Sequence, residues 1–438
     1  MNINKLVYKG DFFMIIYVVE SGDTLFRIGQ RYGLTADEIA AANELPNSNE
    51  LVIGQAIVLP LSSVPHTVVA GDTMYQIARQ YGVTLNSLIA ANPQITNPAR
   101  LNIGTIINVP MGLQNLGSME VNGYAIPGIS EETLIKTLPA LTYITTFSYN
   151  ANEMGNLSTL NDEYILEKAR QAGVQPFMAV TNYREGEGFS SDVARAIFAS
   201  EDATNNLIAE IIRVARDKGF EGVNMDFEYI YPADRDNYSN FLRKLKAALV
   251  PFNLPLFVAV APKTSADQQG TLYEAHDYAA IGEIADRVII MTYEWGYLYG
   301  SPQAISPIKP VIEVLQYAVT EMPSEKILMG VSNYAYDWQL PFVSGTAAEI
   351  MSNTMAVERA KRVGANIMFD EETQSPFYTY YDANGNQHIV WFDDARSYAA
   401  RMVLVDKLNL AGVSYWTINQ FTPSMLLVQQ ALFDVVKA

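Results

Sequence analysis

The sequence has no cysteine and only three histidines among its 438 residues, and both shortages exclude kinds of chemistry. Without cysteine the chain forms no disulfide and no thiolate metal site. The histidines, His66, His276 and His388, lie far apart and lack the spacing of metal ligands. A zinc site or a catalytic triad built on them is therefore not expected. We predict no metal ligands and no cofactor.

Positive charge is also scarce, since 29 Lys and Arg stand against 47 Asp and Glu for a net charge of −18. This balance argues against nucleic acid and anionic membrane surfaces as partners. The apolar run at 12–19 is too short to span a bilayer, and we interpret it as a strand rather than a secretory signal. Residues 1–13 have no counterpart in the repeat described next, so a start of translation at Met14 stays open.

The first quarter of the chain contains two copies of one motif, about 49 residues apart. Gly22-Asp23-Thr24 recurs as Gly71-Asp72-Thr73, and each copy has a later Ala-Asn pair and a final Gly-to-Pro segment. Each copy predicts the order strand, helix, helix, strand, with Asp23 and Asp72 as helix N-caps. We place the copies at 14–61 and 64–111, and a connector at 112–118.

The repeated motif resembles the LysM module, which binds glycans that contain N-acetylglucosamine. The resemblance implies that sugar is held by the loop after the first strand and the loop before the last. In the first copy these loops are Gly22, Asp23 and Thr24 with residues 46–53. In the second they are Gly71, Asp72 and Thr73 with residues 93–103. Helix capping alone would also explain the Gly-Asp-Thr residues, so their binding role depends on the resemblance.

From residue 121 onward, short apolar runs alternate with amphipathic helical patterns. The predicted strands are 121–125, 143–148, 175–180, 222–228, 256–261, 287–292, 326–331 and 412–417. The predicted helices are 130–138, 161–173, 191–198, 204–219, 235–249, 277–284, 308–322 and 395–408. Eight strand–helix units indicate an α/β fold, a (β/α)8 TIM barrel over 119–438. A doubly wound open sheet is the alternative, but no glycine-rich phosphate loop follows the first strand.

The interval between the seventh and eighth strands is too long for one crossover helix. It holds two β-prone runs, 375–381 and 387–392, around the turn residues Asn384 and Gly385. An Asn-Gly pair between such runs is a strong signal for a β-hairpin. We therefore predict a small β-rich insertion at about 338–394, beside the mouth of the barrel.

The fourth predicted strand carries three polar side chains on one face, because side chains alternate along a strand. These are Asn224, Asp226 and Glu228, between the apolar Val223, Met225 and Phe227. A half-exposed edge strand would show the same alternation. Aromatic and polar residues at the other strand ends favour instead a carbohydrate cleft at the carboxyl end of the barrel.

Three segments of the barrel resemble glycoside hydrolase family 18. Residues 222–228 are similar to its strand-four motif D-G-x-D-x-D-W-E, residues 291–294 to its strand-six M-x-Y-D, and Tyr415-Trp416 to its strand-eight tryptophan. With two LysM modules ahead, the whole chain resembles the spore cortex-lytic N-acetylglucosaminidases of that family. Asn224 stands where the family usually has aspartate, so the family's usual proton-sharing scheme does not transfer directly. Glu294 also replaces an aspartate, which leaves its contact with the substrate open.

The resemblance implies roles for individual residues. Glu228 would be the acid/base, Asp226 would accept the acetamido N–H, and Tyr293 would donate to the acetamido oxygen. The expected substrate-binding residues are Trp416, Tyr124, Phe147, Asn182, Asn224, Met291, Glu294 and Trp295.

The implied reaction is retaining, substrate-assisted hydrolysis of β-1,4 linkages after N-acetylglucosamine in peptidoglycan of the spore cortex or its fragments. We expect a monomer, made in the mother-cell cytosol without a cleavable signal and placed on the spore. A chitinase is the enzymatic alternative. A non-catalytic glycan-binding spore coat protein is the alternative of another class, against which the presence of Glu228 argues.

Overall fold

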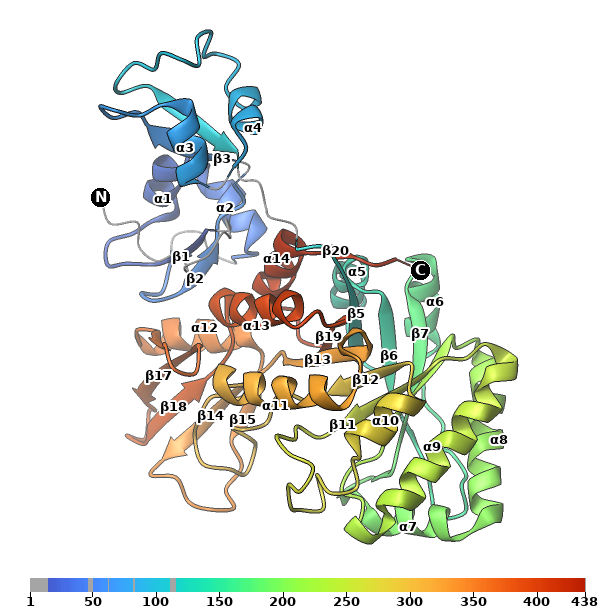
Figure 1. The fold of residues 1–438 in the computed structure, drawn as a ribbon. Helices are drawn as coiled ribbons and strands as arrows, with labels where there is room; N and C mark the ends of the chain where they lie inside the picture. The colour runs from blue at the N-terminus through green and yellow to red at the C-terminus, as the bar shows by residue number, and fades with distance from the viewer. Residues whose placement is uncertain (1–14, 46–49, 62, 82, 111–115, 438) are drawn as a thin grey trace.

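The computed structural model of the chain describes residues 15–45, 50–61, 63–81, 83–110 and 116–437 (Figure 1). Three sequence predictions fall partly outside these residues: the start at Met14, positions 46–49 of the first glycan loop, and positions 112–115 of the connector. No helix in the described ranges is both long and apolar enough to cross a bilayer.

The amino-terminal part folds as two small units, each with the predicted order strand, helix, helix, strand. The first contains β1 (Ile16–Val18), α1 (Leu25–Tyr32), α2 (Ala36–Ala42) and β2 (Ala56–Val58). The second contains β3 (Ser63–Thr67), α3 (Met74–Gln80), α4 (Leu85–Ala90) and β4 (Ile106–Pro110). In each unit the two strands pair antiparallel. The predicted βααβ modules are confirmed.

The predicted helix N-caps in these units are wrong by one residue. Thr24, not Asp23, caps α1 by accepting the Arg27 N–H at 3.2 Å, and Thr73 caps α3 in the same way. The Asp23 carboxylate instead accepts the Glu20 N–H at 2.8 Å and the Tyr17 hydroxyl at 2.6 Å. Asp23 therefore closes the turn before the helix, and the hydroxyl of the next residue is left to satisfy the first turn.

A repeated asparagine fixes the last strand of each unit. The Asn43 side chain donates to the Val58 carbonyl at 2.7 Å and accepts the Val58 N–H at 2.9 Å. Asn92 makes the matching pair of bonds to Asn108, at 2.6 and 2.7 Å. These asparagines belong to the repeated Ala-Asn pairs of the sequence, and their side chains hold the end of the second helix to the last strand.

The rest of the chain is built on eight parallel strands that close into a barrel. Each strand pairs with the next, and the last pairs with the first through Val413 and Val121. The closed barrel is confirmed and the open-sheet alternative is wrong. In order, the strands are β5 (Ser118–Ala125), β6 (Tyr143–Asn150), β7 (Gln175–Thr181), β10 (Gly222–Asp226), β11 (Leu256–Val260), β12 (Arg287–Ile290), β13 (Ile327–Ser332) and β19 (Gly412–Trp416).

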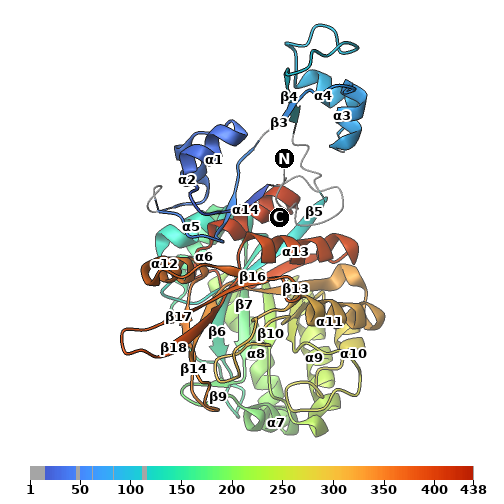
Figure 2. The same ribbon diagram turned by 90° about the vertical axis from the view of Figure 1, so that its left-hand side faces the viewer.

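Helices surround the barrel and cover its apolar strands (Figures 1 and 2). The longest shows why they form: α8 begins at an N-cap, Ser200, buries Leu207 and Ile211, and ends at Gly219 with φ of 69°. These helices are α5 (Glu131–Thr137), α6 (Glu163–Gln171), α7 (Ser191–Ala199), α8 (Glu201–Lys218), α9 (Arg235–Leu249), α10 (Tyr278–Ile284), α11 (Ile308–Glu321), α13 (Ala395–Lys407) and α14 (Pro423–Leu432).

Between β13 and β19 lies the predicted β-rich insertion, an antiparallel sheet of five strands with a helix. Its hairpin turns at Gly385, whose φ is 81°. The insertion consists of β14 (Ala335–Leu340), β15 (Glu349–Met351), α12 (Asn353–Val363), β16 (Met368–Asp370), β17 (Ser375–Tyr381) and β18 (Gln387–Trp391). Three short strands complete the fold: β8 (Tyr183–Arg184), β9 (Gly188–Phe189) and β20 (Asp434–Val435).

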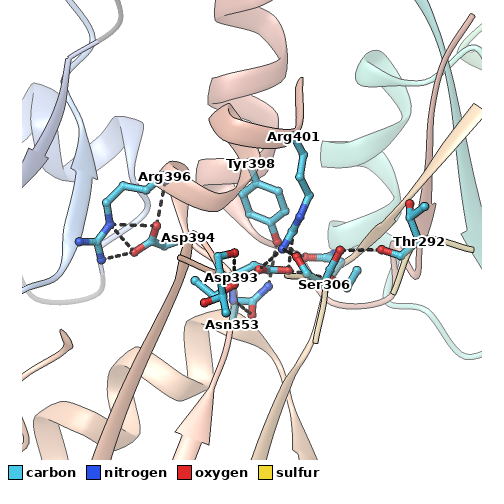
Figure 3. A network of polar contacts seen from close by, with 12 residues as sticks. Thr292, Ser306, Asn353, Asp393, Asp394, Arg396, Tyr398 and Arg401 are labelled. Carbon is cyan, nitrogen blue, oxygen red and sulfur yellow. Dashed lines mark hydrogen bonds and ion pairs between the residues drawn. The ribbon is translucent and has the colours of Figure 1, made fainter. Parts of the chain in front are cut away.

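A buried polar network ties the end of the insertion to the barrel (Figure 3). Asp393 receives two hydrogen bonds from Arg401, at 2.8 and 2.7 Å, and both side chains are 2% exposed. Arg401 also donates to the Ser306 carbonyl, and the Ser306 hydroxyl donates to the Thr292 carbonyl at 2.6 Å. Since Thr292 immediately precedes Tyr293, this network supports the segment that carries a candidate catalytic residue.

Candidate active site

One cavity of about 600 Å³ opens at the carboxyl ends of the barrel strands. It collects nine of the predicted site residues on its wall. They are Asp226, Glu228, Tyr293, Trp416, Tyr124, Phe147, Met291, Glu294 and Trp295. Residues from five separate strands meet here because the carboxyl ends of parallel strands in a barrel form a single rim.

The two carboxylic acids come from the end of β10. Asp226 is the last residue of the strand, and Glu228 continues its alternation two residues later. Burial raises the pKa of Asp226 to about 7. Burial, and next the negative charges of Asp226 and Glu294, raise the pKa of Glu228 well above its usual value. Asp226 therefore ionises first, and Glu228 keeps its proton near neutral pH, as a general acid must.

The backbone that carries these acids is held from two sides. The Asn182 amide donates to the Glu228 carbonyl at 2.8 Å and accepts the Glu228 N–H at 2.9 Å. His276 Nε2 lies 2.9 Å from the Phe227 carbonyl, and its Nδ1 accepts the Ala261 N–H at 2.9 Å. Burial lowers the pKa of His276 to about 4, so the ring is neutral and its Nε2–H is the donor.

Tyr293 reaches the cavity just beyond β12. It is 8% exposed, and burial raises the pKa of its hydroxyl well above the usual value. The hydroxyl therefore stays protonated and is able to donate a hydrogen bond. The ring lies over Gly330 of β13, where an added Cβ would come within 2.8 Å of it. Glycine at position 330 makes room for the tyrosine, a requirement that the sequence does not reveal.

Glu294 follows directly and has a left-handed backbone with φ of 68°. The hydroxyls of Tyr334 and Tyr336 both donate to its Oε1. Burial raises the pKa of Glu294, and these two hydrogen bonds partly oppose that shift because they favour the charged form. A carboxylate with fixed orientation thus faces the cavity beside Glu228.

Three aromatic rings form the apolar floor. The centroid of the Trp416 ring lies 4.7 Å from that of the Phe147 ring and 5.3 Å from that of the Tyr124 ring, and both pairs are edge-to-face. Beneath them, Phe177 and Phe257 fill the barrel with rings 4.3 Å apart. A flat apolar surface below acidic groups suits a sugar ring, whose faces are apolar and whose edges are polar.

Two predicted substrate-binding residues do not lie on the cavity wall. Asn182 is fully buried behind Glu228, and Asn224 is fully buried and donates to the Tyr124 hydroxyl. Within the described residues, Asn224 Oδ1 and Asp226 Oδ1 are buried without a hydrogen-bond partner. The structure places both asparagines beneath the site, where they contact its side chains and backbone rather than its open space.

Several residues on the cavity wall are not predicted from the sequence. They lie on connecting loops or the short strand β9, so no strand-end rule points to them. Tyr229 has one signal, because it follows Glu228 directly, and it is 44% exposed with φ of 53°. The other missed wall residues are Phe189, Leu272, Tyr273 and Tyr297.

No described residue of the predicted glycan loops in the two small units lies on the wall of this cavity. In both loops the glycine and threonine are exposed and the aspartate is partly buried: Gly22, Asp23 and Thr24 in the first, Gly71, Asp72 and Thr73 in the second. This placement leaves them free to meet a ligand, and their binding role stays a prediction.

Residues 124–420 match glycosyl hydrolases family 18, and residues 17–60 and 66–110 match the LysM domain. The chain is 42% identical to the cortical fragment-lytic enzyme of Bacillus subtilis (strain 168), over 97% of this chain and 99% of that protein. It is 40% identical to the enzyme of the same name from Bacillus anthracis, over 92% of this chain and 95% of that protein.

Two solved structures are also similar. The crystal structure of the spore cortex-lytic enzyme SleL from Bacillus megaterium QM B1551 has a TM-score of 0.90 and 38% identity, covering 98% of this chain and 100% of that one. A chitinase from Chromobacterium violaceum has a TM-score of 0.66 and 26% identity, covering 72% of this chain and 98% of that one. The chain therefore belongs to glycoside hydrolase family 18, as an enzyme with two LysM domains ahead of its barrel.

Proposed function

We propose that the protein hydrolyses β-1,4 linkages after N-acetylglucosamine in peptidoglycan, with spore cortex or its fragments as substrate. One observation carries the proposal: Glu228, Asp226 and Tyr293 meet in a single cavity, over an aromatic floor that suits a sugar ring. We further propose that the enzyme acts as a monomer, is made in the mother-cell cytosol and is retained on the spore. Its LysM modules would bind the glycan.

The first step would use the proton that Glu228 retains near neutral pH. Glu228 donates this proton to the glycosidic oxygen, and the bond from that oxygen to the sugar C1 breaks. The carbonyl oxygen of the substrate's own 2-acetamido group bonds to C1 and gives an oxazolinium ion. Family 18 is among the retaining glycosidases in which the substrate, rather than a second carboxylate, supplies the nucleophile.

Asp226 and Tyr293 would orient the acetamido group. The unpartnered Asp226 Oδ1 accepts the acetamido N–H, and the charge of Asp226 stabilises the positive intermediate. The Tyr293 hydroxyl donates to the acetamido oxygen. In the second step the Glu228 carboxylate takes a proton from water as the water oxygen attacks C1, which opens the ring and restores Glu228 with the original configuration at C1.

Similarity over the whole chain to cortical fragment-lytic enzymes supports peptidoglycan as the substrate. A chitinase activity is the second candidate, favoured by the similarity of the barrel to a chitinase. Both substrates present N-acetylglucosamine to the reacting position. They differ in the neighbouring sugar, which in peptidoglycan carries a lactyl ether and a peptide or lactam.

A product analysis tests the proposal. The protein and its Glu228→Gln variant are incubated with purified cortex fragments and with chitin oligomers, and products are identified by mass spectrometry. We expect new reducing ends at N-acetylglucosamine from cortex fragments, and a loss of at least about 10³-fold in rate for the variant. Full hydrolysis by Glu228→Gln would overturn the mechanism, and cleavage of chitin alone would favour the second candidate.

A further inference from the structure

The two LysM copies differ in what surrounds the segment before their last strand. In the first copy this segment, 50–55, contacts the insertion and the helix that follows it. The Ile367 N–H donates to the Ile53 carbonyl at 2.9 Å, and Lys361 pairs with Glu50 at 2.7 Å. The side chain of Val52 is 5% exposed and belongs to the apolar core of the insertion, with Ile367 and Phe392.

The matched glycines of the two copies show the same contrast. Gly54 and Gly104 both have φ of 85°, so both turns need the same backbone. An added Cβ on Gly54 would lie 1.8 Å from the Ile367 carbonyl oxygen, whereas one on Gly104 would meet no atom of the described residues within 4 Å. Arg396 also donates to the Gly54 carbonyl at 3.2 Å, and Figure 3 shows it beside the ribbon of the first copy. Protein closes over the first turn and leaves the second open.

The last strands of the two copies differ in the same way: β2 is covered by the barrel and one face of β4 is exposed. The residues at matched positions are apolar in the covered strand and include a polar one in the exposed strand. In the first copy β2 contacts α13 and α14, and Val58 is 4% exposed within the core of the barrel. The residue at the matched position of the second copy is Asn108, which is exposed. Ile106 is 56% exposed where the first copy has Ala56 against the barrel. Asn102 likewise replaces Val52 and is exposed.

We infer that the two LysM copies have separate tasks, an inference that rests on the proposed glycan-binding function. The first copy is a docked part of the catalytic unit, because the insertion occupies its segment 50–55. The second copy, which stands away from the barrel, provides retention on insoluble glycan that contains N-acetylglucosamine (Figure 2). The second copy has exposed apolar side chains next to its open turn, Ile103 and Ile106, at 71% and 56% exposure, and a third, Tyr75, in the first turn of α3, at 63%.

Matched pairs of substitutions in the full chain test this division. Tyr75→Ala with Ile103→Ala alters the second copy, and Phe26→Ala with Ile53→Ala alters the matched positions of the first, all of them exposed side chains. Retention is measured by co-sedimentation with purified peptidoglycan sacculi. We expect the second-copy pair to weaken retention about tenfold or more, and the first-copy pair to change it less than about twofold.

Equal weakening by both pairs, a larger effect of the first-copy pair, or no effect of the second-copy pair would overturn the inference. Failure of the unaltered chain to bind sacculi or to hydrolyse fragments would instead refute the proposed function. The two failures are therefore distinguishable.

A second pair of variants tests the docking itself. Gly54→Ala and Gly104→Ala impose the same backbone strain, since φ is equal, but only Gly54→Ala collides with the insertion. Thermal inactivation of hydrolysis of a small soluble substrate is compared between them. Gly54→Ala should lower the inactivation temperature by several degrees relative to Gly104→Ala. Equal inactivation temperatures would show that the first copy is not part of the catalytic unit.

Discussion

The side chain of Asn182 holds both backbone groups of Glu228, donating to its carbonyl at 2.8 Å and accepting its N–H at 2.9 Å. Asn182 lies just beyond β7, so the candidate acid is fixed by the neighbouring strand as well as by its own. A positioning error of about 1 Å in a catalytic group can cost about 10²-fold in rate.

Asn182→Ala should therefore lower kcat by roughly 10- to 100-fold and change KM less than about threefold. The small change in KM follows because Asn182 does not lie on the cavity wall. Steady-state kinetics on cortex fragments give both constants. Asn206→Ala is the matched control, since this partly buried asparagine also donates to a backbone carbonyl, that of Met154, and neither residue lies on the cavity wall. A rise in KM with an unchanged kcat would contradict the positioning role.

The pH dependence of kcat/KM should report the two carboxyl groups. Activity rises as Asp226 ionises, with a pKa of about 7, and falls where Glu228 loses its proton at higher pH. The charge of Glu294 is one cause of the raised pKa of Glu228. Glu294→Gln removes that charge, so the fall on the basic side should move to lower pH, by roughly half a unit to one unit.

The shape of the profile is compared with that of Glu210→Gln, a change in a surface ion pair with Arg213 that should leave the profile unaltered. If the fall in activity at high pH stays in place or moves to higher pH in Glu294→Gln, the charge of Glu294 does not raise the pKa of Glu228.

The buried Asp226 should also make the protein less stable as pH rises. Its pKa is about 7 in the folded chain and about 3.9 when unfolded, so the folded state binds more protons between these values. The free energy of unfolding therefore falls as pH rises from about 4 to about 7. This loss is absent in Asp226→Asn. The free energy of unfolding of the variant, relative to that of the unaltered chain, should therefore increase by about 2–4 kcal/mol across that range.

Thermal unfolding curves at pH 4.5 and 7.5 measure the difference. Asp217→Asn, at an exposed carboxylate on the same barrel, is the control and should show little change with pH. A difference in stability between Asp226→Asn and the unaltered chain that is the same at both pH values would contradict the raised pKa of Asp226.

Removal of one partner of the ion pair between Arg401 and Asp393 should destabilise the protein more than breaking an exposed ion pair, because both side chains are 2% exposed. Arg401→Met leaves the Asp393 carboxylate buried without its ionic partner and should cost about 3–5 kcal/mol. Arg213→Met breaks an exposed pair with Glu210 and should cost less than about 1 kcal/mol. Urea unfolding followed by tryptophan fluorescence compares the two, and equal costs would contradict the buried role.

The barrel is predictable from sequence because its strands are short apolar runs and its helices carry clear end signals. Helix α9 has the predicted bounds, 235–249. Helix α12 was missed although Ser352 caps it and Gly364 ends it, since it lies inside a segment whose hairpin signal suggested only strands. Helix α14 is also absent from the prediction, although it begins with Pro423, a favourable first helical residue.

The candidate site likewise contains residues that local sequence patterns predict and residues that only the tertiary structure places. Asp226, Glu228 and Tyr293 follow from strand alternation and from the rule that strand ends share a rim. Asn182 is on the expected rim too, but its contact with Glu228 depends on how β7 and β10 pair, which no local pattern records. Wall residues such as Tyr229 and Tyr297 lie on loops, where a position in sequence says little about a position in space.

The pairing of β19 with β5 has a consequence for how the chain folds as it is made. Strand β5 ends at Ala125, and its second neighbour in the barrel begins only at Gly412. During synthesis β5 therefore presents one open edge until nearly the whole chain has left the ribosome. Each LysM unit has an apolar core of its own and can form early. Docking of the first unit and closure of the barrel must wait, and a chain truncated before residue 412 keeps an exposed strand edge that favours aggregation.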